Sequence, residues 1–392
     1  SIELGVFDTL GAMTRKGSRR SVEHIAKACG CSKNGVKILL DALVLKGFLT
    51  KSSPKSSAYD LSHWSAKYLD KSSQSYLADA VHWYNCDEFT ELVRNNLNTV
   101  VISGKSESVS LSEKDTLLQK YSQNMTNFNR SLALKVATSI LSIGGKRDLI
   151  LDVGSGHGLV GPSLATMELG NDDTTHERSK LVTIDKSAAL GSAFENAANA
   201  NLKNERYTQV KGDPVSSDWG KYKADSILFV DYLNECDWEE VLTLLKKAKR
   251  SLKENGSIYI VETFSNEEND LISPVITVPL LMLTKGSVRS FMEYKKFCLE
   301  VGFKSADLIS LPNSKHSVIV LRNDSKRVLE IPLESEKSKE IFDRNKHKIV
   351  PREGFSSPEE NTWSYPMSLG DFVGLVERMV LSSITQNPFD QK

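Results

Sequence analysis

The chain has 392 residues, of which 40% are hydrophobic and 26% are charged, and this size and balance are typical of a folded protein with two or three domains. Lysine plus arginine and aspartate plus glutamate each number 50, which disfavours a protein whose main task is to grip nucleic acid or an anionic membrane. No apolar run approaches the roughly 20 residues that span a bilayer. We therefore expect no membrane and no nucleic-acid partner.

Five cysteines are scattered along the chain and form no CxxC pair. A metal site on Cys29 and Cys31 with a third ligand elsewhere is one alternative. We adopt the simpler interpretation, which is reduced thiols in a cytoplasmic protein with no metal site. The chain begins at Ser1 inside a helical pattern, so targeting is only weakly constrained.

The first 70 residues predict three short helices followed by an extended hairpin. Ser21 is placed as the N-cap of the second helix, and Gly47 marks the end of the third. The segment FLTKSSPKSSAYDLS (48–62) then indicates a strand, a turn and a second strand. Helix, turn, helix and β-wing together form a winged helix.

Two functions compete for this winged helix. A DNA reader should present basic and amide side chains from the second helix of its helix-turn-helix, which is the third predicted helix of this chain. That helix offers Lys33, Asn34 and Lys37 but also Asp41. A dimerisation and substrate-lid module should instead have an apolar excess, and the other face of this helix is strongly apolar.

The rest of the chain changes in texture twice. We assign 1–100 to the winged-helix region, 101–147 to a helical linker and substrate-pocket segment, and 148–322 to a doubly wound α/β domain. The predicted strands of that domain lie in DLILDVGSG, KLVTID, YTQVKGD, ADSILFVD, SIYIVETF and HSVIVLR. The apolar segment 272–283 is interpreted as a loop or short helix over a pocket.

The C-terminal extension, 323–392, is charged and irregular except for one candidate amphipathic helix at 368–384. A covering arm, a partner-binding helix and a loosely ordered tail all remain open for this extension.

The most informative motif is LILDVGSGHG (149–158), in which a buried strand runs into a glycine-rich turn. Gly154 and Gly156 let the backbone approach a ligand closely. Asp152 stands where a dinucleotide-binding fingerprint has an apolar residue, and the third glycine of that fingerprint is missing. An acidic residue in this place favours a ligand that carries positive charge over a pyrophosphate.

Two further acids end the next two predicted strands. Asp185 closes VTID, where a carboxylate can accept both ribose hydroxyls, and Asp213 closes KGD at the same sheet edge. Three acids at three successive strand ends predict a nucleoside site with little phosphate character. The alternative is that these are ordinary turn-forming residues.

These motifs resemble the class I S-adenosylmethionine-dependent O-methyltransferases, in the branch of the plant caffeate and hydroxyindole enzymes and their microbial relatives. The segment LGVFDTL, the helix and wing, and EYKKFCLEVGF (293–303) carry the same resemblance over roughly 1–322. It implies a Rossmann-like catalytic domain, S-adenosylmethionine as cofactor, a small-molecule acceptor, and a homodimer formed by a winged helix that does not read DNA.

The resemblance also assigns roles to particular positions. The methionine end of the cofactor, its ribose and its adenine would be bound by residues that follow the successive strands, and Met125 would pack on the acceptor ring. The implied cofactor residues are Asp152, Gly154, Gly156, Asp185, Lys186, Asp213, Pro214 and Phe229.

Family members that methylate phenols place a histidine base at the end of the fourth strand. An ungapped alignment of ADSILFVDYLNECDWEEV puts Asn234 at that position, followed by Glu235. Glu262 matches a glutamate that orients the base, and Val288 falls where a second such glutamate would be. An amide cannot take a proton at useful pH, so the usual base is absent.

Three hypotheses follow. In the first, an active methyltransferase uses an acceptor that needs no histidine, with Asn234 as an orienting group and Glu235 or Glu262 as an alternative base. In the second, the protein binds the cofactor but performs other chemistry or none. In the third, it is a DNA-binding regulator that senses a small ligand.

Overall fold

The structure is a computed structural model. It describes residues 1–51, 53, 56–73, 76–84, 86–104, 115–168, 175–202, 204–265, 280, 283–311, 314–323 and 336–345. The chain divides into two units, one containing Ser1–Asp79 and the other the described residues of Ala80–Val350. The predicted pocket-covering segment 272–283 lies almost entirely outside the described residues, and the candidate helix 368–384 lies entirely outside them.

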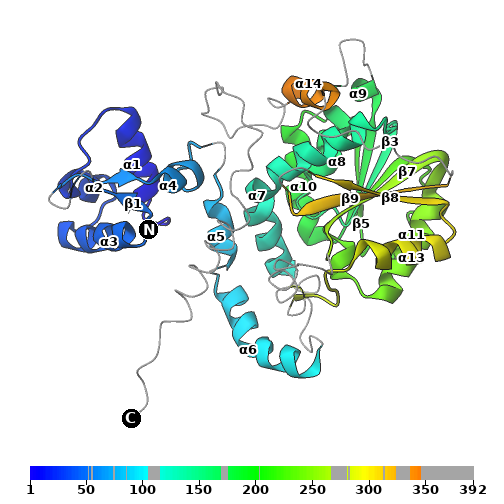
Figure 1. Cartoon of the computed structure of the whole chain (residues 1–392), viewed down its shortest axis with the longest axis horizontal. Helices are drawn as coiled ribbons and strands as arrows, with labels where there is room; N and C mark the ends of the chain where they lie inside the picture. Colours follow the sequence, from blue (N-terminus) through cyan, green and yellow to red (C-terminus); the bar gives the residue numbers. More distant parts are fainter. Residues whose placement is uncertain are drawn as a thin grey trace. The chain divides into compact units, whose positions relative to one another are not determined.

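The first unit is a winged helix (Figure 1). Ser21 does stand at the N-cap position, but its hydroxyl bonds to the side chains of Glu23 and His24, whereas the Ser32 hydroxyl accepts a backbone N–H from Gly35 at 3.1 Å. The elements of this unit are α1 (Val6–Arg15), α2 (Val22–Ala28), α3 (Lys33–Leu45), β1 (Leu49–Thr50), β2 (Asp60–Leu61) and α4 (His63–Tyr68), with α5 (Ala78–Tyr84) at the boundary.

The basic side chains of α3 are engaged in ion pairs. Lys33 lies 2.5 Å from Glu23, and Lys37 lies 2.7 Å from Asp41. Lys51 of the wing reaches the same Asp41 at 2.5 Å. These lysines are therefore partly neutralised within the fold, which weakens the DNA interpretation of the helix.

The second unit is built on a seven-stranded sheet in the order β5-β4-β3-β6-β7-β9-β8. The five strands from β5 to β7 are parallel, β9 is antiparallel to β7, and β8 is antiparallel to β9. The strands are β3 (Leu149–Val153), β4 (Lys180–Asp185), β5 (Tyr207–Lys211), β6 (Ala224–Val230), β7 (Leu252–Thr263), β8 (Ser305–Ser310) and β9 (His316–Arg322). All six predicted strands form, while the edge strand β8 was not predicted.

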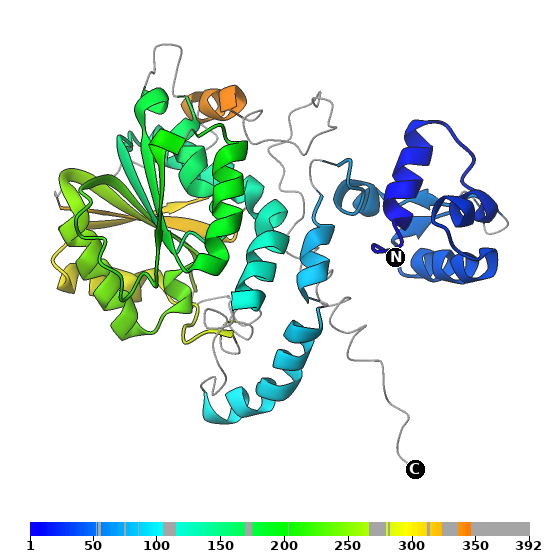
Figure 2. The ribbon, with the colours of Figure 1, turned by 180° about the vertical axis from the view of Figure 1, so that it is seen from behind.

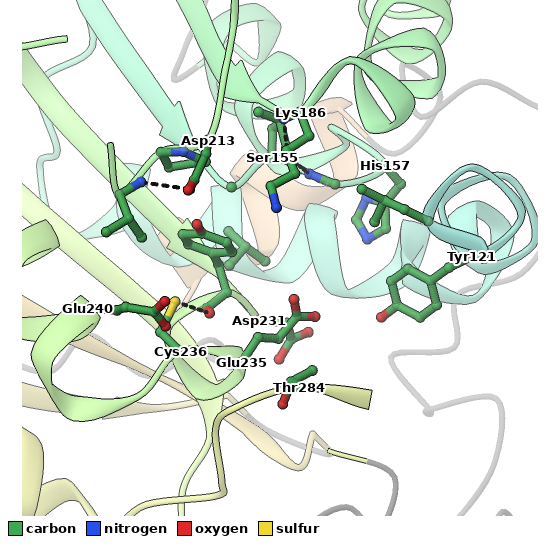
Figure 3. Close-up of a pocket in the computed structure, with 18 of the residues that line it drawn as sticks. Tyr121, Ser155, His157, Lys186, Asp213, Asp231, Glu235, Cys236, Glu240 and Thr284 are labelled. Atoms are coloured by element: carbon green, nitrogen blue, oxygen red, sulfur yellow. Dashed lines mark hydrogen bonds between the residues drawn. The ribbon is translucent and has the colours of Figure 1, made fainter. Parts of the chain in front are cut away.

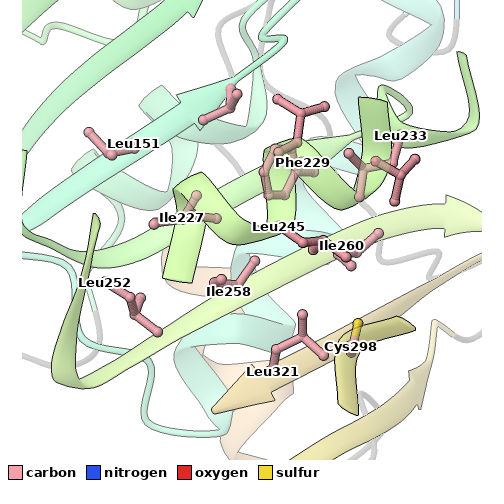
Figure 4. Close-up of a cluster of buried hydrophobic side chains, with 14 of the residues drawn as sticks. Leu151, Ile227, Phe229, Leu233, Leu245, Leu252, Ile258, Ile260, Cys298 and Leu321 are labelled. Atoms are coloured by element: carbon pink, nitrogen blue, oxygen red, sulfur yellow. The ribbon is translucent and has the colours of Figure 1, made fainter. Parts of the chain in front are cut away.

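Helices cover both faces of this sheet, as both views of the ribbon show (Figures 1 and 2). Those of this unit are α6 (Asp87–Ser103), α7 (Asp115–Ser142), α8 (Val160–Thr166), α9 (Thr175–Arg178), α10 (Ser187–Asn199), α11 (Trp238–Ser251), α13 (Phe291–Glu300) and α14 (Glu336–Asn345). Figure 4 shows one apolar layer, in which Ile227 and Phe229 of β6 meet Leu245 of α11. Burial of such side chains supplies the main driving force for folding of this unit.

The short helix α14 was not predicted, because its residues are strongly charged. It docks on the second unit through few but specific contacts. Asn345 accepts the N–H of Glu168 and donates to its carbonyl, both at 2.8 Å, while the Ser338 hydroxyl lies 2.9 Å from that of Ser142. Ile341 is buried between these bonds. At least this part of the C-terminal extension belongs to the second unit. In the described part of the chain, no helix is long and apolar enough to cross a membrane.

We expect Asn345→Ala to lower the free energy of unfolding of the second unit by about 2 kcal/mol, because the partly buried backbone groups of Glu168 would lose their hydrogen bonds to the Asn345 side chain. Urea unfolding followed by intrinsic fluorescence measures this change. Lys339→Ala, on the exposed face of the same helix, is the control and should change stability by less than about 0.5 kcal/mol. Equal stabilities of the two variants would show that α14 is not anchored through Asn345.

Candidate active site

The candidate site lies at the ends of strands β3 and β6, which are neighbours in the sheet. The chain continues from β3 to β4 on one side and from β6 to β7 on the other side. In open α/β sheets such a switch point leaves a crevice at the carboxyl ends of the strands. Residues after β3, β4, β5 and β6 line one cavity here, and helix α7 adds a further wall. Figure 3 shows the side chains that face it.

The glycine-rich loop after β3 requires glycine for two separate reasons. Gly154 and Gly156 both have left-handed backbone angles, with φ of 68° and 53°. A Cβ on Gly154 would also lie 2.1 Å from the ring of Tyr232, whereas one on Gly156 would project into open space at the cavity. The loop therefore packs against Tyr232 at one glycine and leaves room for a ligand at the other.

Two carboxyl groups lie beneath and beside this loop. Asp152 is 2% exposed, and its Oδ1 has no hydrogen-bond partner among the described residues. Asp185 accepts the backbone N–H groups of Gly156 and Lys186, each at 2.7 Å. Burial, with a smaller contribution from Asp185, raises the pKa of Asp152 to about 7, and burial raises the pKa of Asp185 to about 6. Both groups would ionise more readily beside a cation.

The end of β6 separates core residues from site residues. Alternate strand residues point to opposite faces, so Phe229 is fully buried in the apolar layer beneath α11 while Val230 lines the cavity. Asp231 follows with φ of 49°, which is unusual for a residue with a side chain. Both of its carboxylate oxygens lie 2.9 Å from Nε2 of His316, which is brought there by β9.

The turn that contains Asn234 is fixed by a buried glutamate. Asn234 is 5% exposed and donates its backbone N–H to Glu262 at 2.8 Å, and the other Glu262 oxygen accepts the Tyr294 hydroxyl at 2.6 Å. Burial raises the pKa of Glu262 to about 8. The Oδ1 atom of Asn234 has no partner in the described part of the chain. Glu262 therefore holds the backbone at position 234 and is itself enclosed.

A second segment clamps the same turn from the opposite side. A Cβ on Gly286 would lie 1.8 Å from the carbonyl oxygen of Asn234, so only glycine permits this approach. Arg289 donates to the carbonyl oxygen of Leu233 at 2.7 Å and to that of Cys236. Val288, between them, is partly buried and does not line the cavity.

The cavity has a wall of different character on α7. Leu118, Tyr121 and Asn129 share one face of that helix and line the cavity, whereas Met125 is buried in a cluster with Trp83. Asp231, Glu235 and Thr284 lie across from Tyr121 in Figure 3. Burial, then the nearby Asp185, Asp231 and Glu262 carboxyls, raises the pKa of Glu235 to about 8.

The predicted residues fall into two groups. Those that line the cavity are Gly154, Gly156, Asp185, Lys186, Asp213, Pro214 and Glu235. Those that do not line it are Asp152, Phe229, Met125, Asn234 and Glu262, all of them buried beside or behind the lining. Among the residues that sequence reasoning missed are Ser155, His157, Asp231, Tyr121 and Thr284. For these missed residues the sequence offered one signal, the histidine within the glycine-rich motif. Within the described ranges, no group of three or more His, Cys, Asp or Glu residues could hold a metal ion.

Comparison with known proteins agrees with this architecture. The model of the O-methyltransferase dimerisation domain matches residues 1–71, and that of the O-methyltransferase domain matches residues 83–304, which is more than half of the chain.

Individual relatives are distant. L-tyrosine C(3)-methyltransferase of Streptomyces lavendulae is 26% identical over 316 residues, 76% of this chain and 82% of that protein. Des-methyl DIF-1 methyltransferase A of Dictyostelium discoideum is 24% identical over 221 residues, 55% of this chain, and the match spans 58% of that protein.

Among solved structures, human N-acetylserotonin methyltransferase in complex with S-adenosylmethionine superimposes with a TM-score of 0.65 at 18% identity, covering 82% of this chain and 91% of that one. At that identity the likeness shows the fold alone. Together with the domain matches, it establishes that the chain belongs to the O-methyltransferase family of S-adenosylmethionine-dependent methyltransferases.

Proposed function

We propose that this chain methylates a small-molecule acceptor without a proton-accepting side chain at the position where phenol-methylating relatives have histidine. The proposal rests on Asn234, which lies in the turn after β6 and cannot accept a proton; the ungapped alignment of this segment with the family assigns it to that position. Its backbone is held by Glu262 and packed against Gly286, while its side-chain Oδ1 has no partner among the described residues and could orient a neighbour.

The residues around the glycine-rich loop fit S-adenosylmethionine. When bound, this cofactor supplies an electrophilic methyl group on a positively charged sulfur. Oδ1 of Asp152 and Oγ of Ser155 are buried and unpartnered among the described residues, and burial raises the pKa values of Asp152 and Asp185, so a bound cation would favour their ionised forms. The residues that would hold the cofactor are Asp152, Gly154, Gly156, Asp185, Lys186, Asp213 and Pro214, with Phe229 supporting the strand from behind.

The acceptor would enter beside α7, between Tyr121 and the acidic residues after β6. A cavity that combines an aromatic wall with Asn129 and Thr284 suits a small, partly polar ring compound. Met125 lies under this wall and would shape it from behind. Two relatives act on aromatic compounds by name, L-tyrosine and N-acetylserotonin, which makes these compounds the first acceptors to try.

Production of S-adenosylhomocysteine tests the proposal directly. The chain is incubated with S-adenosylmethionine and each of L-tyrosine, N-acetylserotonin and caffeate, and then with a metabolite extract. Acceptor-dependent turnover supports methyl transfer. Tight cofactor binding without turnover on any of these would instead favour a protein that binds the cofactor and performs other chemistry or none.

Binding of S-adenosylmethionine should release about one proton near pH 6.5, because its positive charges favour the ionised forms of Asp152 and Asp185. Both folded-state pKa values lie above the ordinary value, so affinity should rise as pH increases through 6 to 7 and level off above that range. Calorimetry in buffers of different ionisation enthalpy counts the protons. S-adenosylhomocysteine, which lacks the sulfonium charge, is the matched ligand and should release fewer.

Asp185→Asn should weaken S-adenosylmethionine binding about 10- to 100-fold at pH 8, since a charged acceptor of hydrogen bonds is replaced by a neutral one. Lys211→Gln, on an exposed side chain of the neighbouring strand, is the control and should leave affinity unchanged. Proton uptake on binding, or unchanged affinity in Asp185→Asn, would contradict the assigned cofactor site.

Asn234→His should create or raise methylation of simple phenols, because it restores the base that the family uses; a positioned base contributes about 100-fold or more. Turnover of caffeate and N-acetylserotonin is compared with that of wild type and of Asn234→Gln, which keeps an amide. If Asn234→His and Asn234→Gln behave alike, the missing base does not determine acceptor choice.

We also infer that the protein is a homodimer formed through its winged-helix region. Ile38 and Leu45 stand seven residues apart on one face of α3 and are 64% and 87% exposed, so that none of the described residues covers these apolar side chains. Leu45→Asp should therefore convert the dimer to monomer in sedimentation velocity, whereas Lys27→Asp on the exposed face of α2 should not. A wild-type monomer at micromolar concentration would contradict this inference.

A further inference from the structure

The amide of Asn234 does not line the cavity, so an acceptor that must lose a proton needs another base. Glu262 is 1% exposed and already accepts two hydrogen bonds. Glu235 lines the cavity, but its raised pKa means that it carries a proton at neutral pH. The carboxylate oxygens of Asp231 both face the ring of His316. These acids are therefore poor or occupied proton acceptors.

His157 is the one histidine among the residues that line the cavity in the described part of the chain. Its backbone is anchored, since Asn196 donates to its carbonyl oxygen at 2.7 Å and the next residue, Gly158, packs against Ala193. Its Nδ1 is buried with no partner among the described residues. The loop thus holds His157 at the cavity, while its Nδ1 is left without a hydrogen-bond partner among the described residues.

Burial keeps the free ring of His157 neutral, while one nearby carboxylate, Asp231, favours its protonated form. Burial lowers the pKa of His157 to about 4; Asp231 opposes this effect, and Arg130 of α7 adds to it. Burial disfavours ionisation of Asp231, but His316, Lys315 and His157 outweigh it and hold its pKa below the ordinary value. Figure 3 shows Asp231 and Glu235 across the cavity from His157 and Tyr121.

We propose that His157 is the proton acceptor of this methyltransferase and that Asp231, positioned by His316, stabilises the imidazolium that forms. The inference rests on the proposed function and supplies the base that position 234 lacks. In the step, the acceptor atom forms a bond to the methyl carbon, the electron pair of the broken carbon–sulfur bond stays on sulfur, and the acceptor's proton passes to the imidazole of His157. The balance is the same for an oxygen, nitrogen, sulfur or carbon acceptor.

This arrangement assigns separate work to three residues from distant parts of the chain. The imidazole of His157 is neutral over the physiological range of pH, so one ring nitrogen keeps a lone pair for a proton; because burial lowers its pKa, holding that proton depends on the negative charge of Asp231. Asp231 supplies negative charge where positive charge develops, which lowers the energy of the transition state most effectively when the group needs no reorientation. The paired contacts from His316 and the left-handed backbone at Asp231 provide that fixed orientation.

Two measurements test the proposal, one without any acceptor. In protein labelled at histidine Cε1, the signal lost in His157→Gln identifies this ring, and its NMR titration should show a neutral ring at pH 7. Asp231→Asn should move the midpoint to still lower pH, because the carboxylate that favours protonation is gone. A ring protonated at pH 7, or a midpoint unchanged by Asp231→Asn, would overturn the proposal. Calorimetry with S-adenosylhomocysteine shows that each variant retains its cofactor site.

Turnover provides the second measurement, with the acceptor found in the panel above. His157→Gln should lower kcat about 100-fold or more with little change in KM, and added imidazole should restore part of the rate in His157→Ala. His24→Gln, in the exposed start of α2, is the control and should keep the wild-type rate. His316→Gln should lower kcat less than His157→Gln and shift the titration of His157.

The outcomes separate this inference from the function on which it rests. Full turnover in His157→Gln, together with no rescue of His157→Ala by imidazole, would show that His157 is not the proton acceptor. Methyl transfer as the proposed function would not be contradicted by that result. A wild-type chain with no turnover on any acceptor contradicts the proposed function, and the NMR titration then still decides whether His157 and Asp231 form the coupled pair.

Discussion

The crowding of carboxyl groups at one edge of the parallel sheet is the constraint on which the rest of this structure depends. Asp152 lies in β3, Asp185 ends β4 and Asp231 follows β6, which are neighbouring strands, and Glu235 and Glu262 complete the cluster around the next turn. Burial leaves little water to separate their charges, so the pKa values of four of them are raised and only Asp231, beside His316, remains readily ionised. A positively charged cofactor would favour the ionised forms of these carboxyl groups.

The turns around this cluster of carboxyl groups are tightly packed. The lack of a side chain at Gly154 leaves room for the ring of Tyr232, and the lack of one at Gly286 leaves room for the backbone of Asn234. Two segments far apart in sequence therefore pack closely around the site. Arg289 and Glu262 then hold the turn between them by hydrogen bonds to its backbone. Such fixed backbones suit a reaction in which alignment of acceptor and methyl group provides much of the rate enhancement.

The fold also extends past the segment that matches the O-methyltransferase domain, which ends at residue 304. Strands β8 and β9 complete the sheet beyond that point, and β9 delivers His316 to the site. Helix α14 then adds its few hydrogen bonds to the opposite part of the unit. A charged sequence hid α14 from pattern analysis, because its anchoring depends on Asn345 and Ile341 and not on a long apolar stripe.

By itself, the sequence determined six of the seven strands of the large sheet, the glycine-rich turn, the acids at the strand ends and the absence of histidine at position 234, because each of these is written in local residue order. Only the tertiary structure decided which side chains reach the cavity. The two-residue period of β6 sends Phe229 into the core and Val230 to the site, and a bond across 85 residues pairs Asp231 with His316. His157 sits inside the quoted motif, yet its role depends on what faces it across the cavity. Local order fixes backbone conformation, whereas long-range packing fixes charge, burial and partners, and these set the chemistry of a site.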